Sequence, residues 1–141
     1  MKKSISIFGV TGSVGNSTIE LLRKRKDEFE VIAITCNSDI KNISLLANEF
    51  NPKIVAVANE KKLKELKENI PSNIKCYAGS EGICEAASYK SDIAIASIVG
   101  LAGLKPLIES IKSSSVIALA NKECIVSAGS LIKKLSKVLL S

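Results

Sequence analysis

The chain has 141 residues, of which 46% are hydrophobic and 24% are charged. These values predict one globular domain with a substantial core. No apolar run approaches the roughly 20 residues that a membrane-spanning helix needs, and no signal peptide is recognisable after the first lysines. The four cysteines form no CxxC pair, and there is no histidine, which argues against a zinc site. We therefore expect a cytoplasmic protein with reduced thiols and no membrane partner.

The net charge of +6 raises the question of nucleic-acid binding. The lysines are spread over the chain, and in the segment Glu60–Glu68 they alternate with glutamates at helical spacing. This pattern is typical of a solvated helix face with ion pairs between successive turns. Aromatic residues make up only 4% of the chain, so bases would find few stacking partners. We predict no nucleic-acid partner.

The most informative segment is a glycine-rich turn near the N-terminus. A predicted strand, Ser4–Phe8, is followed by Gly9, Gly12 and Gly15, and helical spacing begins with Val14–Arg25. A helix N-terminus has unpaired N–H groups and partial positive charge, and glycines let the backbone approach a pyrophosphate closely. No Gly-Lys-Ser/Thr follows, which excludes a P-loop. The order of strand, turn and helix predicts a phosphate cradle.

The rest of the chain alternates between short apolar runs and helical patterns. Further strands are predicted at Glu30–Thr35, Lys53–Ala58, Asn73–Tyr77, Asp92–Ala96 and Ser115–Ala118. Further helices are predicted at Ile40–Glu49, Glu60–Glu68, Gly82–Ala87, Leu104–Ser110 and Ser127–Leu140. This alternation predicts an α/β fold of the Rossmann type, a doubly wound, mainly parallel sheet with helices on both faces.

Ligands of such sheets bind beyond the carboxyl ends of the strands. In this chain those ends are Gly9–Gly15, Cys36–Asp39, Ser97–Gly103 and Ala120–Glu123, and all four are polar or glycine-rich. They are expected to form one site, in which Lys122 could orient an anionic or enolate-like oxygen.

The second strand carries no acidic residue at its tip, where an NAD site usually has one to bind the ribose 2′-hydroxyl. Asn37 and Ser38 come first, and the first acid is Asp39. This order favours NADP. A cation that could bind the 2′-phosphate of NADP is absent from Asn37 and Ser38, and the nearest one is Lys41. The same residues could instead cap the next helix. Capping and ligand binding are compatible, so both interpretations stay open.

Three stretches together resemble the N-terminal domain of the 1-deoxy-D-xylulose 5-phosphate reductoisomerases, bacterial and plastid enzymes of non-mevalonate isoprenoid synthesis. They are Gly9–Thr18, Ile98–Leu104 and Ala118–Glu123. The first stretch also fits semialdehyde dehydrogenases, whereas the second and third at this separation are more specific. The resemblance covers essentially the whole chain and implies an NADPH-binding domain at residues 1–141.

The resemblance also implies roles for individual residues. The pyrophosphate turn would be formed by Thr11, Gly12, Ser13 and Val14. The 2′-phosphoribose end would be lined by Asn37, Ser38 and Asp39, where the family often has a lysine or arginine that this chain lacks. The nicotinamide ribose would contact Asn121 and Glu123, and Lys122 would contact the substrate.

The family's metal-binding Asp-Ser-Glu motif follows shortly after Asn-Lys-Glu, and this chain stops at Ser141 without it. We therefore expect a fragment that binds NADPH without turnover and has no metal site. The parent oxidoreductase would hold Mg²⁺ or Mn²⁺ in a further catalytic domain, carry a C-terminal domain and form a homodimer. It would isomerise 1-deoxy-D-xylulose 5-phosphate and reduce it to 2-C-methyl-D-erythritol 4-phosphate. The alternatives are the cofactor domain of another NADP-dependent enzyme, such as aspartate-semialdehyde dehydrogenase, and a non-catalytic nucleotide-binding module.

Overall fold

A computed structural model describes residues 2–97, 104–119 and 138–140 of the chain. Its strands are β1 (Lys3–Phe8), β2 (Phe29–Cys36), β3 (Ile54–Val57), β4 (Lys75–Ala78), β5 (Ser91–Ala96), β6 (Ser114–Leu119) and β7 (Val138–Leu140). Its helices are α1 (Ser13–Lys24), α2 (Ile40–Phe50), the 3₁₀ turn η1 (Glu60–Lys62), α3 (Leu63–Asn69), α4 (Gly79–Ala87) and α5 (Leu104–Ser113).

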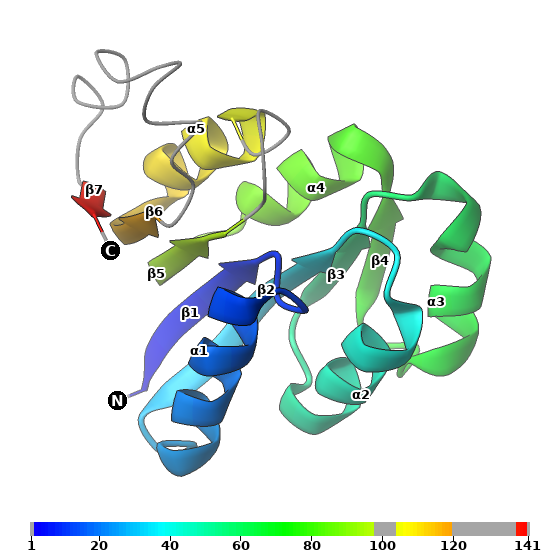
Figure 1. Cartoon of the computed structure of the whole chain (residues 1–141), viewed down its shortest axis with the longest axis horizontal. Coiled ribbons are helices and arrows are strands. Elements are labelled where there is room, and N and C mark those ends of the chain that lie inside the picture. Colours follow the sequence, from blue (N-terminus) through cyan, green and yellow to red (C-terminus); the bar gives the residue numbers. More distant parts are fainter. Residues whose placement is uncertain (1, 98–103, 120–137, 141) are drawn as a thin grey trace.

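The strands form one seven-stranded sheet in the order β4-β3-β2-β1-β5-β6-β7, and every neighbouring pair is parallel. β1 lies in the middle, and the chain leaves it in one direction through β2 and returns to its other side at β5 (Figure 1). This reversal is the switch point of a doubly wound sheet. The predicted Rossmann-type fold is therefore confirmed.

Helices cover both faces of the sheet, as Figure 1 shows. On one face α1, α2 and α3 pack on the strands through residues such as Leu22, Ile43 and Leu66, each at most 2% exposed. On the other face α4 and α5 pack through Ile83 and Leu107 onto alanines of the sheet. The buried residues of the central strands β2 and β3 are almost all apolar because both faces of these strands are covered.

Most of the predicted elements are found within a few residues of their predicted bounds. The segment predicted as one helix from Glu60 is divided into η1 and α3. The predicted helix Ser127–Leu140 is wrong at its end, because Val138–Leu140 forms β7. The rest of this predicted helix lies outside the described part of the chain. β7 pairs with residues Ile117–Leu119 of β6, whose open edge offers backbone hydrogen bonds to a short apolar run. Three consecutive apolar residues fit both the helical and the strand period, so the hydrophobic pattern alone does not distinguish a helix from a strand here.

No helix in the described part of the chain is both long enough and apolar enough to span a membrane. Likewise, residues 2–97, 104–119 and 138–140 contain no group of three or more His, Cys, Asp or Glu side chains that could hold a metal ion.

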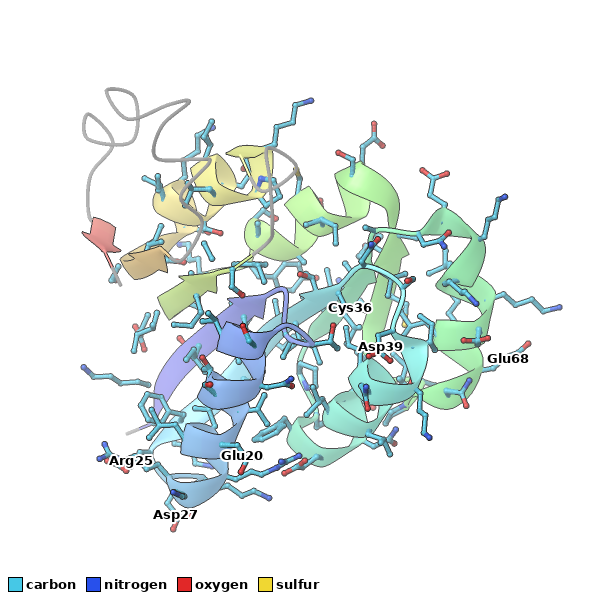
Figure 2. The ribbon with its side chains drawn as sticks, in the orientation of Figure 1. Glu20, Arg25, Asp27, Cys36, Asp39 and Glu68 are labelled. Carbon is cyan, nitrogen blue, oxygen red and sulfur yellow. The ribbon has the colours of Figure 1, made fainter. Side chains whose placement is uncertain are left out.

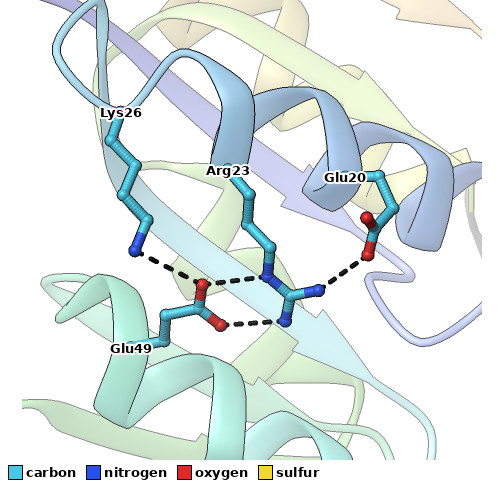
Figure 3. Close-up of polar contacts among 4 residues, drawn as sticks. All are labelled: Glu20, Arg23, Lys26 and Glu49. Carbon is cyan, nitrogen blue, oxygen red and sulfur yellow. Dashed lines mark hydrogen bonds and ion pairs between the residues drawn. The ribbon is translucent and has the colours of Figure 1, made fainter.

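An ion-pair network links α1 to α2 at the amino-terminal end of the sheet (Figure 3). The guanidinium of Arg23 binds the Glu49 carboxylate with two hydrogen bonds of 2.9 Å, and its third nitrogen lies 2.7 Å from Glu20. Lys26 Nζ lies 3.6 Å from Glu49 Oε2. The hydrogen bonds from Arg23, with the charges of Arg23 and Lys26, hold the pKa of Glu49 below its ordinary value.

This network predicts a pH-dependent stability. Because the folded-state pKa of Glu49 is lowered, its contribution is present above the ordinary glutamate pKa and is lost as pH falls through the folded-state value. We expect Glu49→Gln to lower the free energy of unfolding at pH 7 and to have little effect near pH 2, as measured by urea titration. Glu68→Gln, at an exposed position on α3 (Figure 2), is the control. An equal effect of Glu49→Gln at both pH values would contradict the assignment.

Candidate functional site

A cavity of about 490 Å³ lies at the carboxyl ends of the strands, beside the switch point. Its walls come from the turn after β1, the ends of β2 and β3, the residue after β5, and the starts of α4 and α5. The lining residues are Gly9, Thr11, Gly12, Thr35, Cys36, Asn37, Ala58, Ser80, Ile83, Ser97 and Pro106. The cavity is therefore where a doubly wound sheet binds its ligand.

The three glycines of the turn serve different structural needs. Gly9 has a φ of +84°, in the left-handed region that favours glycine. Gly15 is buried, and a Cβ there would lie 2.5 Å from Gly9 O and would also overlap Val10 O. Gly12 has an ordinary φ of −79°, and the nearest heavy atom to a Cβ there is Gly9 O at 3.5 Å. The fold requires glycine at two of the positions and leaves space at Gly12, beside the cavity.

The N-terminus of α1 has features that suit an anion. Its N-cap is Gly12, which has no side chain to cap the helix, and the first turn contains no acidic residue. Ser13 and Val14 in that turn are exposed, and the first orphan N–H groups carry the positive end of the helix dipole. The predicted turn residues Thr11, Gly12, Ser13 and Val14 thus fit a phosphate, with Thr11 and Gly12 lining the cavity.

The predicted 2′-phosphoribose residues lie at the end of β2, where all three are exposed. Asn37 lines the cavity. Asp39 caps α2, because its carboxylate accepts hydrogen bonds from the backbone N–H of Asn42 at 3.3 Å and from the side-chain amide of Asn42 at 2.7 Å. Capping of α2 is therefore confirmed for Asp39. Ser38 lies between Asn37 and Asp39. The predicted Asn121, Lys122 and Glu123 lie outside the described residues.

The cysteine at the end of β2 is a buried, neutral thiol. Burial raises the pKa of Cys36 to about 12. Its Sγ lies 3.8 Å from the carbonyl oxygen of Asp39, and Figure 2 shows the two residues at the same end of the sheet. Cys36 thus forms part of the cavity wall and is unsuited to act as a nucleophile at neutral pH.

Sequence reasoning missed several cavity residues. Ser80 and Ile83 come from α4, Pro106 comes from α5, and Ala58 follows β3. Ala58 could have been found, because it ends a predicted strand at the binding edge. Ser80 was hidden because α4 begins at Gly79 and not at the predicted Gly82. Pro106 reaches the cavity wall only through the packing of α5 on the sheet, which no local sequence pattern predicts.

Comparison with known proteins decides the family. The model of the 1-deoxy-D-xylulose 5-phosphate reductoisomerase family matches residues 5–129. The chain belongs to this family. The resemblance predicted from the three motifs is confirmed, and the family is favoured over the semialdehyde dehydrogenases.

Two curated members of the reductoisomerase family illustrate the similarity. The chain is 42% identical to the enzyme of Caldanaerobacter subterraneus subsp. tengcongensis over 97% of its own length and 36% of the relative's. It is 44% identical to the enzyme of Bradyrhizobium sp. strain ORS 278 over 90% of its length and 31% of the relative's. The chain therefore spans about a third of the length of these reductoisomerases.

Solved structures of reductoisomerases match the fold closely. The Zymomonas mobilis enzyme in complex with NADPH superposes with a TM-score of 0.92 at 33% identity, over 99% of this chain and 38% of that one. A reductoisomerase in complex with NADPH, fosmidomycin and magnesium superposes with a TM-score of 0.89 at 31% identity, over 98% of this chain and 35% of that one.

Proposed function

We propose that this chain is the NADPH-binding domain of a 1-deoxy-D-xylulose 5-phosphate reductoisomerase. The observation that carries the proposal is the cavity at the switch point, bordered by an uncapped helix N-terminus in a chain of this family. The similarity to a family member in complex with NADPH supports the choice of cofactor. The parent enzyme would rearrange 1-deoxy-D-xylulose 5-phosphate and reduce the product to 2-C-methyl-D-erythritol 4-phosphate.

The pyrophosphate of the cofactor would lie against Thr11, Gly12, Ser13 and Val14. N–H groups of the first turn of α1 would donate to its oxygens, and the helix dipole would offset part of its charge. This arrangement needs no lysine or arginine in the turn, and the turn contains none.

The 2′-phosphoribose would lie at Asn37 and Ser38, whose side chains offer neutral hydrogen-bond donors. Asp39 already accepts two hydrogen bonds from Asn42, so its carboxylate is held at the start of α2. We infer that the Asp39 carboxylate does not bind the ribose 2′-hydroxyl, as the acid of an NAD site does.

The remaining proposed roles concern the nicotinamide end. Asn121 and Glu123 would contact the nicotinamide ribose, and Lys122 would orient an oxygen of the substrate as a charged donor. Bound NADPH supplies the hydride for the reduction. Mg²⁺ or Mn²⁺ would be held by a further domain of the parent, and one family member is known in complex with magnesium. We also propose that the parent is a homodimer of the bacterial cytoplasm.

The cofactor preference is the first test of this function. We expect the chain to bind NADPH more tightly than NADH by about tenfold or more, which corresponds to roughly 1.4 kcal/mol. The reason is the lack of a free carboxylate at the tip of β2 and the presence of amide and hydroxyl donors there. Calorimetric titration of the purified chain with both cofactors measures the ratio. Equal or tighter binding of NADH would overturn the assignment to NADPH.

A further inference from the structure

The peptide groups on both sides of Gly9 are held by hydroxyl groups from two neighbouring strands. On one side, Thr35 is the second-last residue of β2 and is 1% exposed. The backbone N–H of Gly9 donates to Thr35 Oγ1 at 3.0 Å and to Thr35 O at 3.2 Å. The next N–H, that of Val10, donates to Thr35 O at 2.8 Å. Thr35 therefore fixes the start of the glycine turn from the β2 side.

On the other side, Ser97 follows β5 and is half-buried. Its hydroxyl donates to Phe8 O at 2.6 Å and more weakly to Gly9 O at 3.3 Å. Its backbone N–H also donates to Phe8 O, at 3.0 Å. Ser97 therefore fixes the same turn from the β5 side.

These contacts continue to the start of α1. The carbonyl oxygen of Gly9 that the Ser97 hydroxyl approaches also accepts a hydrogen bond from the N–H of Gly12, at 3.2 Å. Gly12 is the N-cap of α1, and its own carbonyl accepts from Asn16 at 2.8 Å. A change in the orientation of the Gly9 peptide would therefore move the N–H groups that the helix presents to the cavity.

We propose that Thr35 and Ser97 are positioning residues for the cofactor, because their hydroxyls hold the glycine turn in the orientation that directs the N-terminus of α1 at the pyrophosphate. The inference rests on the proposed NADPH-binding function and assigns it two residues that need not touch the pyrophosphate. A merely structural role would be to satisfy backbone groups at two strand ends. The two roles differ in what they predict for ligands with and without a pyrophosphate.

The test uses the substitutions Thr35→Val, which keeps the shape of the side chain, and Ser97→Ala. Each is expected to weaken NADPH binding by about three- to tenfold, the range for one lost hydrogen bond. Adenosine 2′-monophosphate has the adenine and the 2′-phosphate but no pyrophosphate, and its affinity should stay unchanged. Thr35→Ser and Ser97→Thr retain the hydroxyl and should restore NADPH binding. Calorimetry and NMR titration measure the affinities.

Ser113→Ala is the matched control. The Ser113 hydroxyl also joins two elements by donating to a backbone oxygen, that of Ala87 at 2.6 Å, at a position that does not line the cavity. This variant should lower the free energy of unfolding and leave NADPH affinity unchanged. The Thr35 and Ser97 substitutions are made in separate variants, so either variant tests the proposal if the other fails to fold.

Wild-type NADPH affinity in Thr35→Val and Ser97→Ala would overturn the positioning role while leaving the NADPH site in place. A parallel loss of affinity for adenosine 2′-monophosphate would also overturn it, because the effect would then extend beyond the pyrophosphate. A failure of the unchanged chain to bind NADPH would instead overturn the proposed function, and this inference with it.

Discussion

Gly12→Val is expected to abolish detectable NADPH binding while the chain stays folded. The backbone at Gly12 has φ −79° and ψ 178°, an extended conformation that valine adopts readily. A Cβ would have only Gly9 O nearby, at an ordinary contact distance of 3.5 Å. Because Gly12 lines the cavity, the branched side chain would stand where the pyrophosphate approaches α1. We expect affinity to fall by roughly 100-fold or more, about 2.7 kcal/mol, as measured by calorimetry.

The fold of this variant is checked by its circular dichroism spectrum and by urea unfolding. The free energy of unfolding should change by no more than about 0.5 kcal/mol, as at other exposed positions. Gly12→Ala adds a smaller group and should bind NADPH with intermediate affinity. If Gly12→Val is folded and binds NADPH like the unchanged chain, the glycine turn is not the phosphate site.

Gly15→Val is expected to have the opposite effect, a large loss of stability. Gly15 lies in the first turn of α1 against the backbone of the preceding turn. An added Cβ would lie 2.5 Å from Gly9 O and would overlap Val10 O, and both are backbone atoms of a turn that is hydrogen-bonded to Thr35 of β2. α1 would have to shift away from β1, at a cost of about 3 kcal/mol or more. That is a large share of the roughly 5–15 kcal/mol that stabilises a typical domain.

Urea unfolding measures this loss, and Ser17→Val is the control. Ser17 is exposed on the same helix, so its substitution carries the cost of a β-branched residue in a helix without a backbone overlap. We expect the control to change stability by less than about 1 kcal/mol. Equal stability of the two variants would show that the close approach at Gly15 is not required.

The sheet and the position of the site could be predicted from local patterns because those patterns have direct physical causes. Runs such as Val31–Ile34 are uniformly apolar since both faces of the strand are covered. The glycine turn after Phe8 identifies the preceding segment as the first strand, β1. The doubly wound topology then places this turn at the switch point. The order of elements alone thus located the cavity at the correct edge of the sheet.

The details that the sequence does not predict depend on contacts between distant segments. Val138–Leu140 forms a strand because β6 offers it an open edge. Ser97 contacts Phe8, and Thr35 contacts Gly9, only after β1 lies between β2 and β5. A serine or threonine at a strand end is common, so its partner becomes visible only in the structure.

The central claim is that NADPH binds with its pyrophosphate at the N-terminus of α1, and mapping of amide chemical shifts tests it most directly. The ¹⁵N-labelled chain would be titrated with NADPH, and the spectrum followed residue by residue. We expect the largest saturable shifts at the backbone amides of Gly12, Ser13 and Val14, with smaller shifts at Asn37 and Ser38. Saturable shifts confined to other surfaces, or no saturable shifts with NADPH, would contradict the claim.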